Sequence, residues 1–139
     1  MTTGAAAIET LREALNYGAT LISLKRFEEG KSLLSKTVPA ARRVAGEDKY
    51  LTLMMRMHYA RALYQDEESA TLKDVREAVE TLEDLERTAR RVFGGEHPLI
   101  ATILIFLREA RATLYVHEGD VESLREMVAA MTPGSASSK

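Results

Sequence analysis

Three histidines, His58, His97 and His117, are the side chains in this sequence best suited to acid–base chemistry. A Ser-His-Asp hydrolase needs a nucleophile, a base and an orienting carboxylate brought together around an oxyanion hole. No Gly-x-Ser-x-Gly or comparable nucleophile turn accompanies any of the three. His97 precedes Pro98, where we expect it to cap a helix, and His117 lies beside Glu118 at a predicted turn. We therefore expect no catalytic residues and no enzyme activity.

The stretch Met54-Met55-Arg56-Met57-His58 offers thioether and imidazole groups, which favour soft copper(I). On a helix, however, Met54 shares a face with Met57 and His58, while Met55 points elsewhere. Methionine as adaptable filler in a core or a binding surface is the interpretation we prefer. Cysteine is absent, which excludes disulfides and thiolate zinc sites. Gly94-Gly95 lacks the Gly-Lys-Ser/Thr context of a phosphate loop, so we expect no metal and no cofactor.

Composition limits the class of protein. The 139 residues suit one domain, and 19 Lys+Arg against 21 Asp+Glu leave a net charge of −2. This balance lacks the basic excess of a nucleic-acid surface. The longest apolar run, residues 99–107, falls short of the roughly 20 residues that a membrane span needs. The first residues also lack the basic region of a secretory signal. We expect a soluble, cytoplasmic domain that binds neither nucleic acid nor membrane.

The chain is rich in Ala, Leu, Glu, Arg and Met, with apolar residues at three-four spacing and no alternating β-branched run. This pattern predicts an all-α fold. Six helices are expected, over residues 5–24, 26–45, 49–65, 71–93, 98–117 and 120–131. Thr71 or Asp74 is suited to cap the fourth helix, and Pro98 to begin the fifth. Pro39 should kink the second helix near Val38, and residues 132–139 should form a disordered tail.

An internal repeat organises these helices. Residues 27–46 align without a gap on residues 75–94 after a shift of 48 positions, with Leu34/Leu82, Ala41/Ala89 and Val44/Val92 among the identities. A shortened third copy begins at Gly119-Asp120-Val121. The repeat predicts one domain over residues 5–131, built of hairpins at roughly 5–45, 49–93 and 98–131. One such hairpin cannot bury its apolar face alone, whereas stacked neighbours can.

The segments Leu15-Asn16-Tyr17-Gly18, Lys25-Arg26-Phe27-Glu28-Glu29-Gly30 and Gly95-Glu96-His97-Pro98 resemble tetratricopeptide repeats, and most closely those of kinesin light chains. The resemblance implies a right-handed superhelical stack of three hairpins, an α-solenoid that acts as a protein-binding scaffold. Small residues stand where that family packs its helices closely: Gly18, Ala60, Ala112, Gly30 and Ala78. Two departures are a period longer than the family's ~34 residues and Leu124 at a position for a small residue.

The same resemblance implies a concave groove for a peptide or a partner helix, lined by the first helix of each hairpin. Asn16 matches the backbone-clamping asparagine of the family, but His58 and Ala110 replace its counterparts. An alternative is self-association into a homo-oligomer through the end faces, by Ile8 and Leu11 or by Leu124, Met127 and Val128. The residues expected to bind the partner are Arg12, Asn16, Ala19, Met54, Met57, His58, Arg61, Tyr64, Phe106, Glu109 and Thr113, with Leu15 and Ala110 beside them.

Overall fold

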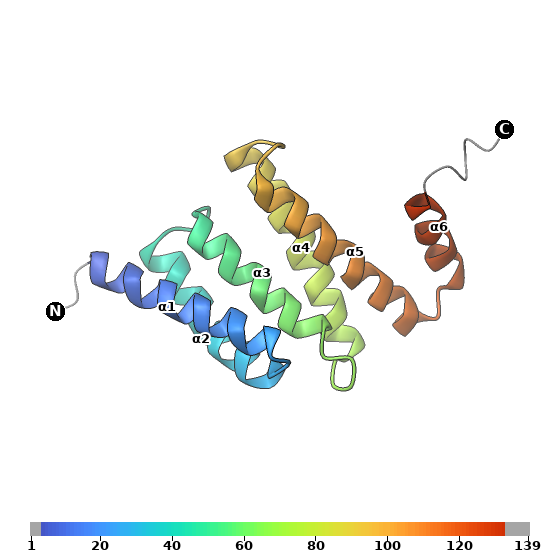
Figure 1. Cartoon of the computed structure of the whole chain (residues 1–139), viewed down its shortest axis with the longest axis horizontal. Helices are drawn as coiled ribbons and strands as arrows, with labels where there is room; N and C mark the ends of the chain where they lie inside the picture. The colour runs from blue at the N-terminus through green and yellow to red at the C-terminus, as the bar shows by residue number, and fades with distance from the viewer. Residues whose placement is uncertain (1–3, 133–139) are drawn as a thin grey trace.

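The structure, a computed structural model, describes residues 4–132 and is helical through most of that range, with no strand in it. Its helices are α1 (Gly4–Ser23), α2 (Phe27–Val44), α3 (Tyr50–Tyr64), α4 (Leu72–Phe93), α5 (Pro98–Glu118) and α6 (Val121–Met131) (Figure 1). The predicted all-α fold is confirmed, and every helix boundary lies within one residue of its prediction. Residues 133–139 of the predicted tail lie outside the described residues.

Local chemistry explains where the helices begin. Thr71 and Asp74 form a reciprocal capping box, in which the Asp74 N–H donates to Thr71 Oγ1 at 3.1 Å. His97 caps α5 by accepting the Leu99 N–H on Nδ1 at 3.0 Å, and Pro98 occupies the first turn, as predicted. Pro39 lies inside α2, which stays helical on both sides of it.

Each helix from α1 to α5 packs against the next, and α1, α3 and α5 also contact one another in succession. In Figure 1 these three helices run in the same general direction, with α2 and α4 returning between them. Two apolar cores result. One is shared by α1, α2 and α3 around Leu34 and Met55, and the other by α3, α4 and α5 around Leu82 and Ile103. Leu11, expected on an end face, is instead buried in the first core.

Small residues allow the close approach of the paired helices. Gly18 and Gly30 are buried where α1 crosses α2, and Ala60 and Ala78 are fully buried in the second hairpin. The prediction for these four positions is confirmed. Ala112 differs, because it remains half-buried. The helix that would cover it, α6, contacts only α5 and stands away from the rest of the fold (Figure 1).

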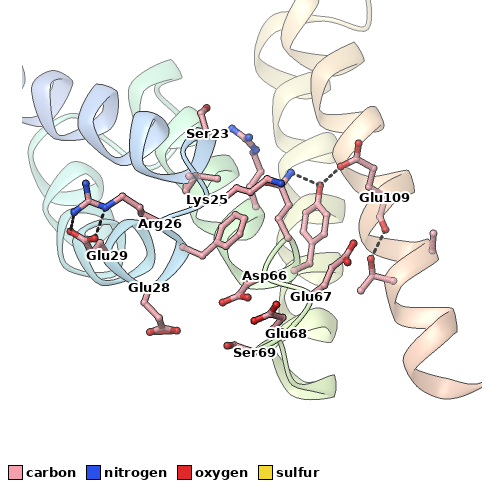
Figure 2. A pocket seen from close by; sticks show the side chains of 17 residues that line it. Ser23, Lys25, Arg26, Glu28, Glu29, Asp66, Glu67, Glu68, Ser69 and Glu109 are labelled. Atoms are coloured by element: carbon pink, nitrogen blue, oxygen red, sulfur yellow. Dashed lines mark hydrogen bonds and ion pairs between the residues drawn. The ribbon is translucent and has the colours of Figure 1, made fainter.

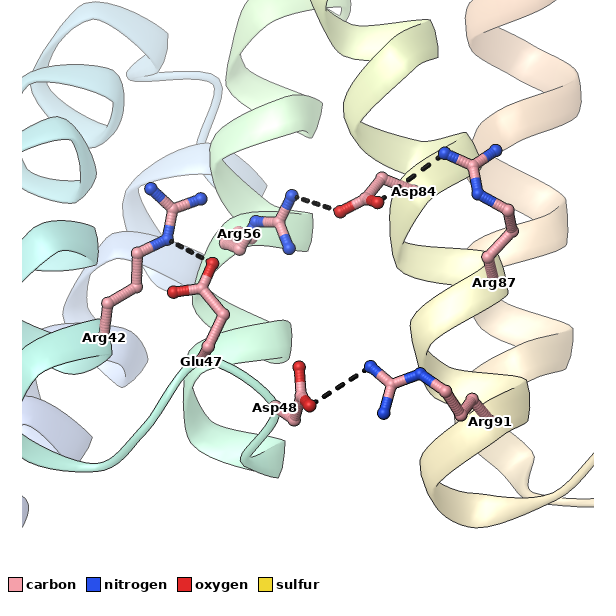
Figure 3. Close-up of polar contacts among 7 residues, drawn as sticks. All are labelled: Arg42, Glu47, Asp48, Arg56, Asp84, Arg87 and Arg91. Carbon is pink, nitrogen blue, oxygen red and sulfur yellow. Dashed lines mark hydrogen bonds and ion pairs between the residues drawn. The ribbon is translucent and has the colours of Figure 1, made fainter.

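Ion pairs join α3 and the turn before it to α4, within the second hairpin (Figure 3). Arg56 of α3 pairs with Asp84 of α4 at 2.9 Å, and Arg87 approaches the same carboxylate at 3.6 Å. Asp48, in the turn before α3, pairs with Arg91 near the end of α4 at 3.1 Å. Arg56 is the most buried of these groups, so its pair is the least screened by solvent.

Candidate functional site

The predicted binding residues of α3 differ in burial. Met57, His58 and Tyr64 are buried, while Met54 and Arg61 are half-buried. On the neighbouring helices, Arg12, Asn16 and Glu109 are exposed, whereas Ala19, Phe106 and Thr113 are half-buried, and Leu15 and Ala110 belong to the cores. These residues belong to the face formed by α1, α3 and α5. A ligand lying on this face would meet side chains of α1 and α5 above a more deeply seated α3.

Arg61 joins the α3 and α5 sides of this face. Its Nη1 donates to His58 Nδ1 at 3.0 Å, and its guanidinium carbon lies 4.8 Å from the centre of the Phe106 ring. Arginine has no acceptor, so His58 must accept on Nδ1 and carry its proton on Nε2. Burial and the neighbouring Arg61 charge lower the pKa of His58 to about 4. His58 is therefore neutral at pH 7.

A second contact, a hydrogen bond between Tyr64 and Glu109, also joins α3 to α5. The Tyr64 hydroxyl donates to Glu109 Oε1 at 2.8 Å and accepts from Gln65 Nε2 at 3.4 Å. Burial, reinforced by the hydrogen bond to Glu109, raises the pKa of Tyr64 above its usual value. The phenol thus stays protonated and holds the Glu109 carboxylate in place.

An open cavity of about 1060 Å³ adjoins these two links. Four of the predicted binding residues line it: Arg61, Tyr64, Glu109 and Thr113. Figure 2 labels Glu109 among them. The other predicted residues lie outside its lining. The rest of the wall comes from the end of α1, the α1–α2 turn, the first turn of α2, the 65–69 loop and Ala112 of α5. All three hairpins therefore contribute to one hollow.

Sequence reasoning missed the two loops that border this cavity. Lys25 adopts a left-handed backbone with φ of 63°, which turns the chain from α1 into α2 at the cavity edge. Across the hollow lie Asp66, Glu67 and Glu68, visible in Figure 2. The acidic run was visible in the sequence only as a break between helices. Its position beside the α1–α2 turn depends on how the hairpins stack, which a local pattern does not reveal.

Carboxylates dominate the cavity rim. Arg26 is engaged by Glu29 through two hydrogen bonds, at 2.6 and 2.8 Å, and Glu28 pairs with Lys31. Within residues 4–132, Asp66, Glu67 and Glu68 form no ion pair. The loop therefore presents uncompensated negative charge to anything that enters the cavity.

The histidines lie in separate places. His58 is held in the middle of α3, His97 caps α5 and stacks on Phe93 at 4.6 Å between ring centres, and His117 is exposed near the end of α5. Among the described residues, no cluster of three or more His, Asp or Glu side chains is arranged to hold a metal ion. No described helix is long and apolar enough to cross a bilayer.

Comparison of the chain with models of protein families, with curated proteins and with solved structures produced no match. The functional argument therefore depends on the geometry described above and on the repeat pattern of the sequence.

Proposed function

We propose that this chain is a non-enzymatic protein-binding module that receives a peptide or a partner helix along α1, α3 and α5. In this proposal the six helices are three tetratricopeptide-like hairpins of the kinesin-light-chain type, stacked in a right-handed superhelix. The succession of contacts from α1 to α3 to α5 and the small residues at the helix crossings support this architecture. Cysteine is absent, which suits the cytoplasmic location we propose.

The cavity is the observation that carries the binding proposal. Its lining comes from all three hairpins, so a ligand there touches each of them at once. Arg61 supplies a half-buried cation, and its Nε has no hydrogen-bond partner among residues 4–132. That Nε is buried, so a backbone carbonyl of a bound chain would satisfy it after a small shift of the Arg61 side chain toward the cavity. Phe106, which Arg61 partly covers, adds an aromatic surface of the kind that anchors peptides.

Acid–base groups in the site are already committed to structural bonds, which supports binding over catalysis. His58 accepts from Arg61, and Tyr64 donates to Glu109. A general base must be free to reach the proton it abstracts. Neither group meets that requirement in this arrangement.

Selection of peptides from a random library on the immobilised chain tests the proposal. Thr113→Trp places a large ring in the cavity, and we expect it to reduce binding of selected peptides at least tenfold. Ser32→Trp introduces the same ring at an exposed position of α2 outside the cavity lining and serves as the matched control. Equal losses from both variants, or no loss from Thr113→Trp, would contradict binding in this groove.

A further inference from the structure

The last helix exposes residues that its counterpart buries. The third copy of the repeat aligns Val121 with Val75, Val128 with Leu82 and Met131 with Leu85. In α4 all three are fully buried, whereas Val121, Val128 and Met131 are 61%, 60% and 51% exposed. None of the residues of α6 is buried. The helix thus carries an apolar stripe that is largely exposed, with Leu124 and Met127 half-buried.

Helix α5 has a matching uncovered surface. Ile105 and Val116 are exposed, yet their equivalents in α3, Leu53 and Tyr64, are buried. Ala112 is the equivalent of Gly18, whose would-be Cβ lies 2.8 Å from Leu34 Cδ2. By the same register, the residue that should fill the space over Ala112 is Val128. The α5 and α6 surfaces are therefore the two halves of one helix–helix interface, separated in the single chain (Figure 1).

The linker between these helices is short. Only Gly119 and Asp120 separate α5 from α6, whereas Leu24–Arg26 join α1 to α2 and residues 65–71 join α3 to α4. Gly119 adopts a left-handed conformation with φ of 69°, as its register equivalent Lys25 does with φ of 63°, yet α6 stands away from α5 where α2 packs on α1. Short connections that hold an element off its own chain favour its exchange with a second copy.

Charges on the two surfaces are complementary. Arg108 of α5 is the register equivalent of Arg56, which pairs with Asp84 across the second hairpin. Glu126 of α6 lies one turn before Ala130, the equivalent of Asp84, and so on the same side of the helix. Both Arg108 and Glu126 are exposed, and neither forms an ion pair within residues 4–132. Arg108 on the α5 surface and Glu126 on the α6 surface can therefore form an ion pair across the interface.

We propose that the partner of this surface is a second copy of the chain, and that two copies exchange their α6 helices. In the exchanged dimer, α6 of each copy lies on α5 of the other, with Val128 over Ala112 and Glu126 near Arg108. The arrangement is two-fold symmetric, so both apolar stripes are buried at once. This self-association goes beyond the proposed function. It would cover Ala112, which lies at the α5 edge of the cavity, and its test uses no peptide.

Sedimentation velocity across a hundredfold range of concentration tests the exchange. The unmodified chain should move from monomer to dimer as concentration rises. Val128→Glu should weaken the dimer at least tenfold with unchanged helicity, because Val128 is exposed in the monomer. Ala129→Glu is the matched control, since the aligned position of α4 is naturally Glu83, and should leave dimerisation unchanged. A chain that is monomeric throughout, or a dimer that tolerates Val128→Glu, would overturn the proposal.

A linker variant separates exchange from simple face-to-face pairing. Insertion of four Gly/Ser residues after Gly119 should let α6 fold back on its own α5, which would convert the dimer to a monomer. A dimer as stable as that of the parent chain would show that α6 is not exchanged and would overturn the proposal. Closure of α6 on its own chain without the insertion would appear as a monomer at every concentration.

Discussion

Arg61 of α3 covers the ring of Phe106 of α5, with 4.8 Å between the guanidinium carbon and the ring centre. The same side chain donates to His58, and Tyr64, one turn later, donates to Glu109 of α5. Cation–π contacts of this kind contribute roughly 0.5–2 kcal/mol, depending on how far they are removed from water. Arg61 therefore belongs both to the packing between hairpins and to the wall of the cavity.

Substitution of Arg61 by glutamate and by the neutral methionine should change the free energy of unfolding by different amounts. Arg61→Glu should destabilise the fold by about 1–3 kcal/mol, because a carboxylate there loses Phe106 and faces Glu109. Arg61→Met loses the cation–π contact and the hydrogen bond to His58, but it keeps apolar packing on Phe106 and removes a half-buried charge, so it should destabilise the chain less than Arg61→Glu. Because Arg61 is half-buried, a charge reversal there disturbs packing as well as the cavity wall.

Urea denaturation of Arg61→Glu and Arg61→Met measures the difference between their free energies of unfolding. If Arg61→Glu were as stable as Arg61→Met, apolar packing on Phe106 and repulsion from Glu109 would carry no energetic weight. Peptide binding should be lost in Arg61→Met, and its retention would place the peptide away from this residue.

Helix positions were predictable from sequence because their signals are local. The 3.6-residue period, the Thr71–Asp74 box and Pro98 each lie within a few residues of the boundary they set. The burial of Met57, His58 and Tyr64 was not foreseen, since it depends on how closely α5 approaches α3. Val128, expected on an end face, is indeed exposed. The exposure of Val121 was missed, because the repeat pattern assigns it to a core but does not fix the angle at Gly119.

Ala78 should tolerate no larger side chain. It is fully buried in the core shared by α3, α4 and α5, so Ala78→Leu is expected to cost about 1–3 kcal/mol by overpacking. Glu80→Leu, on the exposed face of α4, should change stability by no more than about 0.5 kcal/mol. Thermal melting of the pair provides the measurement, and identical curves would contradict the repeat register.

The change in stability caused by Gly18→Ala should reverse its sign when Leu34 is replaced by alanine. A Cβ at Gly18 would meet Leu34 Cδ2 at 2.8 Å and Cγ at 2.9 Å, so Gly18→Ala alone should destabilise the chain by about 1–3 kcal/mol. In a Leu34→Ala background that clash is gone. The higher helix propensity of alanine, worth about 1 kcal/mol, should then make the same change stabilising. A double-mutant cycle by urea denaturation measures this reversal, and additive effects would contradict it.

His58 should make stability depend on pH in mildly acidic solution. Its pKa is about 4 in the folded chain and about 6.5 when unfolded, so between these values the unfolded chain binds more protons. The stabilisation is fully present above pH 6.5 and is lost as the pH falls toward 4. Between pH 7 and pH 5 the loss should be about 2 kcal/mol.

His58→Gln isolates this contribution, because glutamine can still accept from Arg61 but does not titrate. Carboxylates protonate in both chains, so the informative quantity is the difference between their stability profiles. Profiles that run parallel from pH 7 to pH 5 would show that His58 is not buried as described.

Amide chemical-shift mapping with a peptide selected on the chain tests the central claim most directly. If the peptide lies across α1, α3 and α5, the largest shifts should fall at Ala19, Arg61, Glu109 and Thr113. Ser32 and Glu80, which are exposed on α2 and α4, should stay unchanged. Shifts concentrated on α2 and α4, with none in the cavity wall, would contradict binding in the groove.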